Sequence, residues 1–252
     1  MEGELIDLNA GNLAAEHLCC ALSGAKHRDG VEKKRAFLAS GFDAGLTFRK
    51  LDARGKVFIE YAPVEVCSRP IEAPGYLVIH CLWVSGRFKQ QGFARALLDS
   101  CLEAVGERNG VVAVSGSNIW LTRTEFFVHH GFEVVDSTKS GFDLVCYRSR
   151  PDAPTPRFTR RAHEGRASQA KGVLIEYVHQ CPLVPNAVRE MSGAARDLGL
   201  AVEVRELSTP RDAQGAASPF GTFGVFLHGE FLTHGLMGRD SFTALLRERL
   251  ND

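Results

Sequence analysis

Apolar residues along the chain fall into short runs that predict alternating strands and helices. Residues 76–84 are apolar and aromatic over the length of a strand, which predicts a buried strand. From Ala94 onwards the apolar positions are spaced three and four apart, which predicts an amphipathic helix. Residues 110–117 predict a second buried strand, and residues 124–131 a helix that ends at Gly131 before another strand. Phe142 to Tyr147 predict the last strand of this half.

The first 65 residues predict a less regular arrangement. The predicted elements are a strand over residues 5–8, a helix from Asn12 through Leu18, Cys19 and Cys20, a helix over residues 33–39, and a hairpin of residues 46–51 and 56–65.

Proline and arginine become frequent after residue 150, which marks a boundary. We therefore expect a first domain over residues 1–150, a linker over 151–170 and a second domain over 171–252. The second domain is predicted to contain a strand over 172–178, a helix over 187–198, a strand over 201–207, a hairpin around His228 and Gly229, and a final helix ending at Leu250.

Composition narrows the class of protein. The 252 residues include 30 basic and 30 acidic side chains, so the net charge is zero. This balance argues against an extended basic surface that would bind nucleic acid. No apolar run approaches the ~20 residues that span a bilayer. The acidic N-terminus lacks a signal-peptide pattern, so we expect a cytoplasmic protein with no membrane partner. The sequence leaves a homodimer open.

The seven cysteines do not predict a disulfide framework or a metal site. Their number is odd and no pair has Cys-x-x-Cys spacing. Several lie in apolar runs, where a thiol packs as a small hydrophobe. No metal site is predicted.

The segment from Lys89 to Ala94 lies between the predicted strand and the helix. Backbone N–H groups at a helix N-terminus lack partners and carry partial positive charge, which suits an anion. Gly92 lets the backbone approach a phosphate, and Ala94 is small. This arrangement predicts pyrophosphate binding, although a plain strand-to-helix turn has the same pattern.

The spacing resembles the coenzyme A loop of the GNAT acetyltransferases, Gln/Arg-x-x-Gly-x-Gly/Ala, with Lys89 in place of the usual Gln or Arg. Residues 79–86, Gln180-Cys181-Pro182 and residues 218–223 narrow the resemblance to YoaP-like GNAT proteins. It implies an α/β (α+β) fold with a mixed central sheet, acetyl-CoA as cofactor, and a smaller thioredoxin-like domain behind.

The resemblance implies a set of site residues. The coenzyme would contact Leu82, Trp83, Val84, Lys89, Gln90, Gln91, Gly92, Phe93, Ala94, Asn118 and Phe127. His80 matches the usual base on the central strand, because histidine can accept an amine proton near neutral pH; a packed strand histidine is the alternative.

Strand alternation sets a condition on the catalytic residues. It places Val78, His80, Leu82 and Val84 on one face, with Ile79, Cys81 and Trp83 on the other. His80 and Cys81 therefore reach one site only if the strand bulges, as GNAT central strands often do.

Phe127 departs from the family pattern. The tyrosine that protonates the departing thiolate in many GNAT enzymes would lie at this position, and phenylalanine cannot donate a proton. His129, His130 or water would have to replace it, or the thiolate leaves unassisted. A solvated helix end is the simpler interpretation of the two histidines.

Cys181 is expected at a strand-to-helix junction, where the helix end lowers a thiol pKa. Val184 stands where a thioredoxin-like protein has its second cysteine, so a dithiol reaction within this motif is excluded. A monothiol role or a metal site with His179 is one interpretation, and a relic thiol is the other. Ser218-Pro219 would occupy the cis-proline position of that fold.

These features predict an acetyl-CoA-dependent N-acetyltransferase in which a small-molecule amine attacks the thioester directly. One alternative is acyl transfer to a thiol-bearing substrate with help from Cys181. Another is an acyl-CoA-binding or redox-sensing module without turnover. Protein acetylation would need an open peptide groove, which the sequence does not show.

Overall fold

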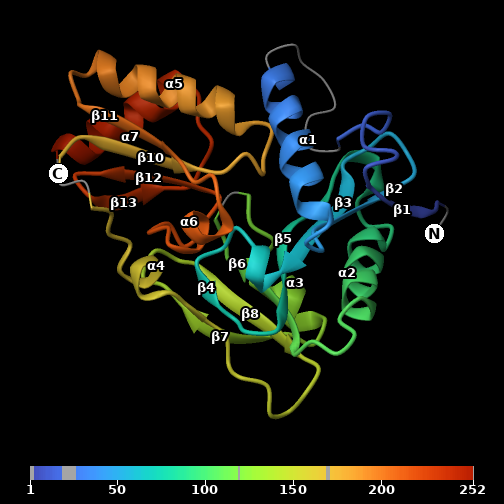
Figure 1. The fold of residues 1–252 in the computed structure, drawn as a ribbon. Coiled ribbons are helices and arrows are strands. Elements are labelled where there is room, and N and C mark those ends of the chain that lie inside the picture. The colour runs from blue at the N-terminus through green and yellow to red at the C-terminus, as the bar shows by residue number, and fades with distance from the viewer. Residues whose placement is uncertain (1–2, 19–26, 119, 169–170, 252) are drawn as a thin grey trace.

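A computed structural model describes residues 3–18, 27–118, 120–168 and 171–251 (Figure 1). Its larger sheet has seven strands in the order β1-β2-β3-β5-β6-β8-β7. Their bounds are β1 Leu5–Asp7, β2 Thr47–Leu51, β3 Val57–Pro63, β5 Tyr76–Val84, β6 Gly110–Ser115, β7 Glu133–Ser137 and β8 Asp143–Arg148. Only β5 and β6 pair in parallel, so the sheet is mixed as predicted.

Two helices cover opposite faces of this sheet. α2 (Phe93–Glu103) packs Leu97 and Leu98 against Ile59 and Leu82 on one face. α1 (Arg28–Phe42) packs Leu38 against the other face. α3 (Thr124–His129) packs against β7 and β8, and Gly131 follows it with a φ of 86°. The predicted strands and helices of this half are therefore confirmed, apart from the corrections below.

The smaller sheet follows the order β11-β10-β12-β13. Its bounds are β10 Val173–Tyr177, β11 Val202–Glu206, β12 Phe223–Leu227 and β13 Glu230–Thr233. α5 (Val184–Asp197) and α7 (Arg239–Asn251) pack Met191 and Phe242 into its core. The sequence of strand, helix, strand, hairpin and helix is the predicted one, with the short α6 (Pro210–Gln214) added.

The predicted linker is packed rather than extended. Within it, β9 (Arg157–Phe158) pairs with β4 (Ile71–Glu72), and α4 (Arg160–Glu164) follows. Phe158 and Ala162 are buried in one cluster with Tyr76 of β5. This part of the segment therefore packs in the core of the larger unit, whereas Gly165 and Ala167 further along form backbone hydrogen bonds with Phe231 and Gly229 of the smaller unit.

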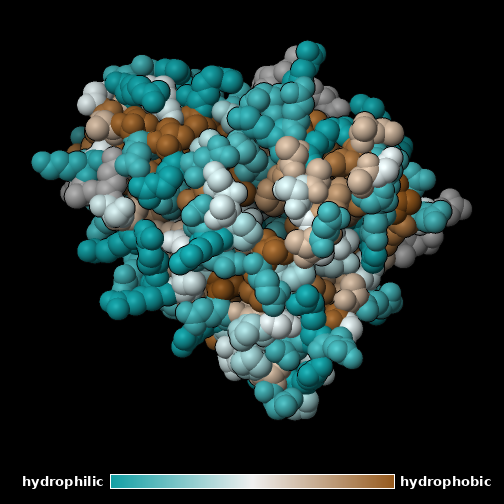
Figure 2. All heavy atoms as spheres, viewed as in Figure 1, coloured by the Kyte–Doolittle hydropathy of each residue, from teal (hydrophilic) through white to brown (hydrophobic). Residues whose placement is uncertain are grey.

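The two units meet along α1. Figure 1 shows α1 between the larger sheet and the start of α5. A side chain at Gly30 would lie 1.9 Å from the carbonyl oxygen of Pro182, so the two backbones approach closely. Hydrophilic residues cover most of the face seen in Figure 2, and hydrophobic ones gather over the smaller sheet below α5.

Two local predictions are wrong. Residues 10–15 form turns, not a helix, because the Asn12 side chain accepts a hydrogen bond from the preceding Asn9 N–H (2.8 Å) and closes a turn; Cys19 and Cys20 lie outside the described residues. The Ser218–Pro219 bond is not cis, since no described peptide bond is.

The predicted side-chain alternation of β5 is also corrected. Cys81 pairs with Glu60 and Ile79 with Tyr61, so His80 is an extra residue in the ladder. This bulge puts Leu82 and Val84 on the α2 face with Leu77 and Ile79, and turns Cys81 and Trp83 toward the α1 face. The bulge on which the joint use of His80 and Cys81 depends is therefore present.

Candidate active site

The loop after β5 has the geometry of a helix-capping turn. A single turn, η3 (Gly86–Phe88), follows Ser85, and Gly92 then caps α2 with a φ of 82°. Lys89, Gln90, Gln91 and Gly92 are exposed. The first N–H groups of α2 therefore point away from the helix toward solvent, as an anion site requires.

Phe93 and Ala94, the next two residues predicted to contact the coenzyme, differ in how far they are exposed to solvent. The Phe93 side chain is buried and packs edge-on against Phe88 (5.8 Å between ring centroids), so only its backbone faces the loop. Ala94 is half-buried. The loop thus offers backbone donors, with the exposed cationic side chains of Arg87 and Lys89 close to them in the sequence.

The strands before the loop separate. β5 and β6 pair only from Tyr76–Gly110 to Ile79–Ala113. Beyond that point the carbonyl of Leu82 accepts a hydrogen bond from the Thr122 hydroxyl (3.4 Å) instead of from a strand. This separation leaves β5 from Leu82 to Val84 without a neighbouring strand on its β6 side, which suits the extended arm of a coenzyme.

Asn118 and Phe127 have structural partners. Asn118 is half-buried, and its amide donates to the carbonyl of Gly141 (3.5 Å). Phe127 is 1% exposed and packs between Phe126 and Phe132. His129 is exposed, and His130 bonds to the carbonyl of Phe126 at the helix end (2.7 Å). As placed, Phe127 is a core residue.

A cavity of about 130 Å³ lies between the two units on the α1 side of β5. The larger unit contributes Lys56, Phe58, His80, Cys81, Trp83 and Trp120. The smaller unit contributes Gln180, Cys181, Phe220, Thr222, His234 and Leu236. The rings of Trp83 and Trp120 stack 5.7 Å apart. The bulge thus brings three predicted site residues, His80, Cys81 and Cys181, to one cavity.

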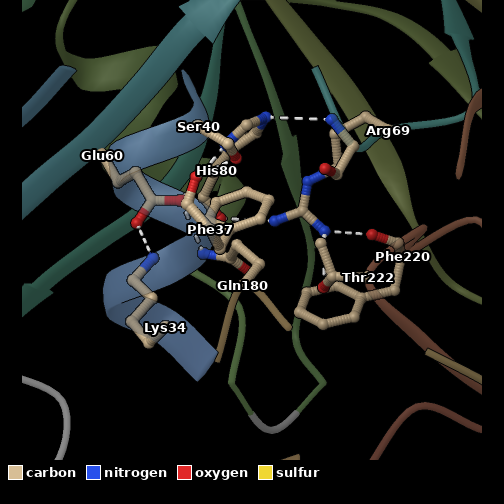
Figure 3. Close-up of polar contacts among 10 residues, drawn as sticks. Lys34, Phe37, Ser40, Glu60, Arg69, His80, Gln180, Phe220 and Thr222 are labelled. Atoms are coloured by element: carbon tan, nitrogen blue, oxygen red, sulfur yellow. Dashed lines mark hydrogen bonds and ion pairs between the residues drawn. The ribbon is translucent and has the colours of Figure 1, made fainter. Parts of the chain in front are cut away.

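A buried polar network lies behind this cavity (Figure 3). Lys34 of α1 forms an ion pair with Glu60 of β3, and both side chains are fully buried. His80 Nδ1 lies 3.2 Å from Glu60 Oε1. Burial raises the pKa of Glu60, but the Lys34 ammonium and the hydrogen bond with His80 outweigh it and bring the pKa to about 2. Glu60 is therefore an anion.

The smaller unit contributes to the same network. The Gln180 amide donates to Glu60 Oε1 (3.0 Å). Arg69 donates to the carbonyls of His80 and Phe220 and lies 3.4 Å from the Thr222 hydroxyl. The network therefore connects α1, β3, β5 and two segments of the smaller unit.

His80 has partners at both ring nitrogens. Nε2 accepts a hydrogen bond from the Ser68 N–H (3.1 Å), so the proton is assigned to Nδ1, which donates to Glu60. Burial lowers the pKa of His80, although Glu60 opposes this shift. The ring is thus neutral near pH 7, but its lone pair is already used. This geometry favours a satisfied strand histidine over a direct proton acceptor.

The prediction of a lowered thiol pKa at Cys181 is wrong. The thiol precedes α5, and the N–H groups of Leu183 and Val184 do favour its thiolate. Burial outweighs them and raises the pKa. Burial likewise raises the pKa of Cys81 to about 12. Both thiols are therefore protonated near neutral pH. His179 pairs with Glu206 (3.3 Å) instead of joining Cys181.

Sequence reasoning missed Lys34, Glu60, Arg69, Gln180 and Trp120. For two of them the sequence contains a clue, a charged residue at a position expected to be buried. Glu60 interrupts the apolar strand Val57–Pro63, and Lys34 lies one helical turn before the buried Leu38. The others come together only in the folded chain.

No group of three or more metal-ligating side chains occurs among the residues that the structure describes. None of the described helices is long and apolar enough to cross a bilayer.

Comparison with known proteins identifies the family. A model of the YoaP-like family matches residues 202–243. A Bacillus subtilis (strain 168) protein named "Uncharacterized N-acetyltransferase YoaP" is 34% identical over 246 residues, covering 96% of this chain and 97% of that protein. The chain belongs to the YoaP-like family of N-acetyltransferases. The predicted YoaP-like identity is thus confirmed over nearly the whole chain.

Solved structures give weaker likenesses to this YoaP-like chain. A Brucella melitensis GNAT acetyltransferase in complex with acetyl-CoA is 15% identical, with a TM-score of 0.38, and covers 61% of this chain and 92% of its own. Escherichia coli YhbS in complex with CoA is 14% identical, with a TM-score of 0.39, and covers 62% and 89%.

Proposed function

We propose that this chain transfers the acetyl group of acetyl-CoA to the amine of a small molecule. The YoaP-like relative is named as an N-acetyltransferase and aligns over nearly the whole chain. The observation that carries the proposal is the arrangement around β5. A glycine-capped helix N-terminus follows the strand at its open end, and a cavity adjoins the same strand at its bulge.

The chain's own backbone fits the coenzyme. The N–H groups from Gln91 to Ala94 would hold the pyrophosphate, since they surround the left-handed Gly92 at the start of α2. The unpaired β5 backbone from Leu82 to Val84 would align the pantetheine arm. Bound acetyl-CoA would supply the reactive thioester: the amine would attack its carbonyl carbon directly, the C–S bond would break, and CoA would leave as the thiolate without a side-chain acid. Holding both reactants in place supplies much of the rate.

We assign the acceptor to the cavity between the units. The smaller unit, proposed as a thioredoxin-like domain over residues 171–252, forms more than half of the wall and so sets specificity. The larger domain would span residues 1–150, with the packed connection of residues 151–170 between them.

His80 is proposed as a positioning residue. Its ring holds the bulge through Glu60 and Ser68, which keeps Cys81 and Trp83 turned toward the cavity. To accept a proton at Nε2 it would have to give up the Ser68 N–H, so we propose that the amine proton leaves to water. His80→Gln keeps both hydrogen bonds without a titrating group. A loss of kcat of a hundredfold or more in that variant would restore His80 as the base.

Acyl transfer assisted by a thiol is the second candidate function. Its support is that Cys81 and Cys181 line one cavity. Burial raises the pKa of both thiols, however, which leaves little thiolate at neutral pH. We therefore propose that the two cysteines shape the cavity.

Calorimetry of acetyl-CoA with Gly92→Asp and Gly92→Asn tests the coenzyme site. Both side chains tolerate a positive φ and have nearly the same shape, so they differ mainly in charge. We expect the Asp variant to bind at least about tenfold more weakly than the Asn variant, because a carboxylate would face the phosphates. Equal affinities in the two variants, or no binding by the wild type, would remove the proposed site.

A further inference from the structure

Among the described residues that line the cavity between the units, one carries a permanent charge, and that charge is positive. It is Lys56, immediately before β3, and no aspartate or glutamate lines the cavity in this part of the chain. Lys56 also forms no ion pair with any carboxylate in the described part of the chain. A ligand would therefore meet an ammonium group that has no internal counter-charge.

A second cation lies directly behind the wall. Arg69 is 2% exposed, and its donors go to the carbonyls of His80 and Phe220, two residues that line the cavity. Its guanidinium lies 4.4 Å from the Phe220 ring centroid. Arg69 has no ion pair within the described residues, and its Nε has no hydrogen-bond partner there. Burial lowers its pKa to about 10, which leaves it charged at neutral pH.

The one carboxylate nearby does not offset these cations. Glu60 is fully buried and accepts from Lys34 at Oε2 and from Gln180 and His80 at Oε1 (Figure 3). Lys34 cancels the Glu60 charge, so Arg69 and Lys56 leave the surroundings of the cavity positive. An isolated ammonium ion would gain no charge partner there.

The rest of the wall is mostly apolar, with the neutral side chains of His80, Gln180 and Thr222 and the ring of His234 as its polar members. Phe58, Phe223 and Leu236 lie beside the stacked rings of Trp83 and Trp120. Aromatic walls with a small number of polar groups suit a ligand with an apolar body and one anchoring group. The anchor that a positive wall favours is an anion.

We propose that the cavity selects an acceptor with an aromatic or large apolar body and a carboxylate, an amino acid or similar amino-carboxylic compound, rather than a simple amine or polyamine. The role of this ligand as acetyl acceptor rests on the proposed function. The preference for a carboxylate rests on Lys56, Arg69 and the missing acidic lining.

Tryptophan fluorescence can report this preference directly. The chain has two tryptophans, Trp83 and Trp120, and both line the cavity. Three probes of similar size are titrated into the full chain without coenzyme: L-phenylalanine, 3-phenylpropionate and phenethylamine. We expect the two carboxylates to bind at least about tenfold more tightly than phenethylamine, the order expected for one charge-assisted hydrogen bond.

Variants at Lys56 assign the effect to the wall. Lys56→Met should abolish the preference, while Lys56→Arg should keep it. Lys33→Met removes an exposed ammonium on α1 and should leave the preference unchanged. Tighter binding of phenethylamine, no binding of either carboxylate, or an unchanged preference in Lys56→Met would each overturn the proposal.

The result of the ligand titrations can be separated from the test of the proposed function, because the three probes are titrated without acetyl-CoA. If the Gly92 variants fail and the carboxylate preference holds, the acetyltransferase proposal falls and the anion-selective cavity remains. If coenzyme binding holds and the preference fails, only the acceptor class is wrong.

Discussion

The two functional parts of β5 differ in how they are built. The loop after the strand is local, since Gly86–Phe88, Gly92 and the start of α2 lie within a few residues of one another and stay exposed. The cavity at the bulge is non-local and combines β3, β5 and two segments of the smaller unit over a buried ion pair. Changes in the loop should therefore affect coenzyme binding alone, and changes under the cavity should affect stability as well.

Lys34→Met should give the largest effect on the cavity side. It leaves the Glu60 carboxylate buried without its cation, which costs about 3–5 kcal/mol in the free energy of unfolding. Urea unfolding followed by circular dichroism measures this loss. The double variant Lys34→Met with Glu60→Gln should recover most of it, because no charge is then left unpaired.

The exposed pair Arg95 and Asp99 on α2 provides a control. Arg95→Ala should cost about 0.5 kcal/mol or less. Equal losses in Lys34→Met and Arg95→Ala would contradict the distinction between the two parts of the molecule.

Acidification should have the next largest effect, because the buried groups behind the cavity then lose part of their contribution to the free energy of unfolding. The pKa of His80 is lower in the folded chain than its ordinary value of 6.5, so the unfolded chain takes up this proton first. The contribution of His80 to the free energy of unfolding is therefore fully present above about pH 6.5 and falls at lower pH, with a limiting slope of about 1.4 kcal/mol per pH unit for one proton. Glu60 adds a further loss as pH falls from 4.5 toward its folded pKa of about 2.

Urea unfolding at several pH values between 7 and 5 measures the His80 contribution. His80→Gln should flatten the slope in this range, because the amide does not titrate. The same slope in the variant and the wild type would show that other groups cause the acid sensitivity.

Cys181→Ala should have the smallest effect. The thiol is protonated near neutral pH, and its removal deletes one polarizable atom from a cavity wall. We expect kcat to stay within about threefold of the wild-type value in a thiol-release assay. A loss of a hundredfold or more would instead give Cys181 a chemical role and revive thiol-assisted acyl transfer.

The same contrast explains what the sequence could predict. The strand Tyr76–Val84, the helix after Gly92 and the order of elements in the smaller unit follow from periodicity and capping, which depend on neighbours in the chain. The bulge at His80 was foreseen only as a condition for the joint use of His80 and Cys81.

The network itself was not predicted. Gln180 reaches Glu60 across 120 positions of sequence, and Arg69 reaches Phe220 across 151. No local pattern encodes such contacts. The pKa of Cys181 was misjudged because burial, which depends on tertiary packing, outweighs the N–H groups of Leu183 and Val184 that lie next to it in the sequence.

Amide hydrogen exchange of the full chain with and without acetyl-CoA tests whether the coenzyme binds along the open end of β5. We expect slower exchange in peptides that cover Leu82–Val84 and Lys89–Arg95, while α5 and α7 exchange as before. Protection confined to the smaller unit, or no change around Gly92, would contradict it.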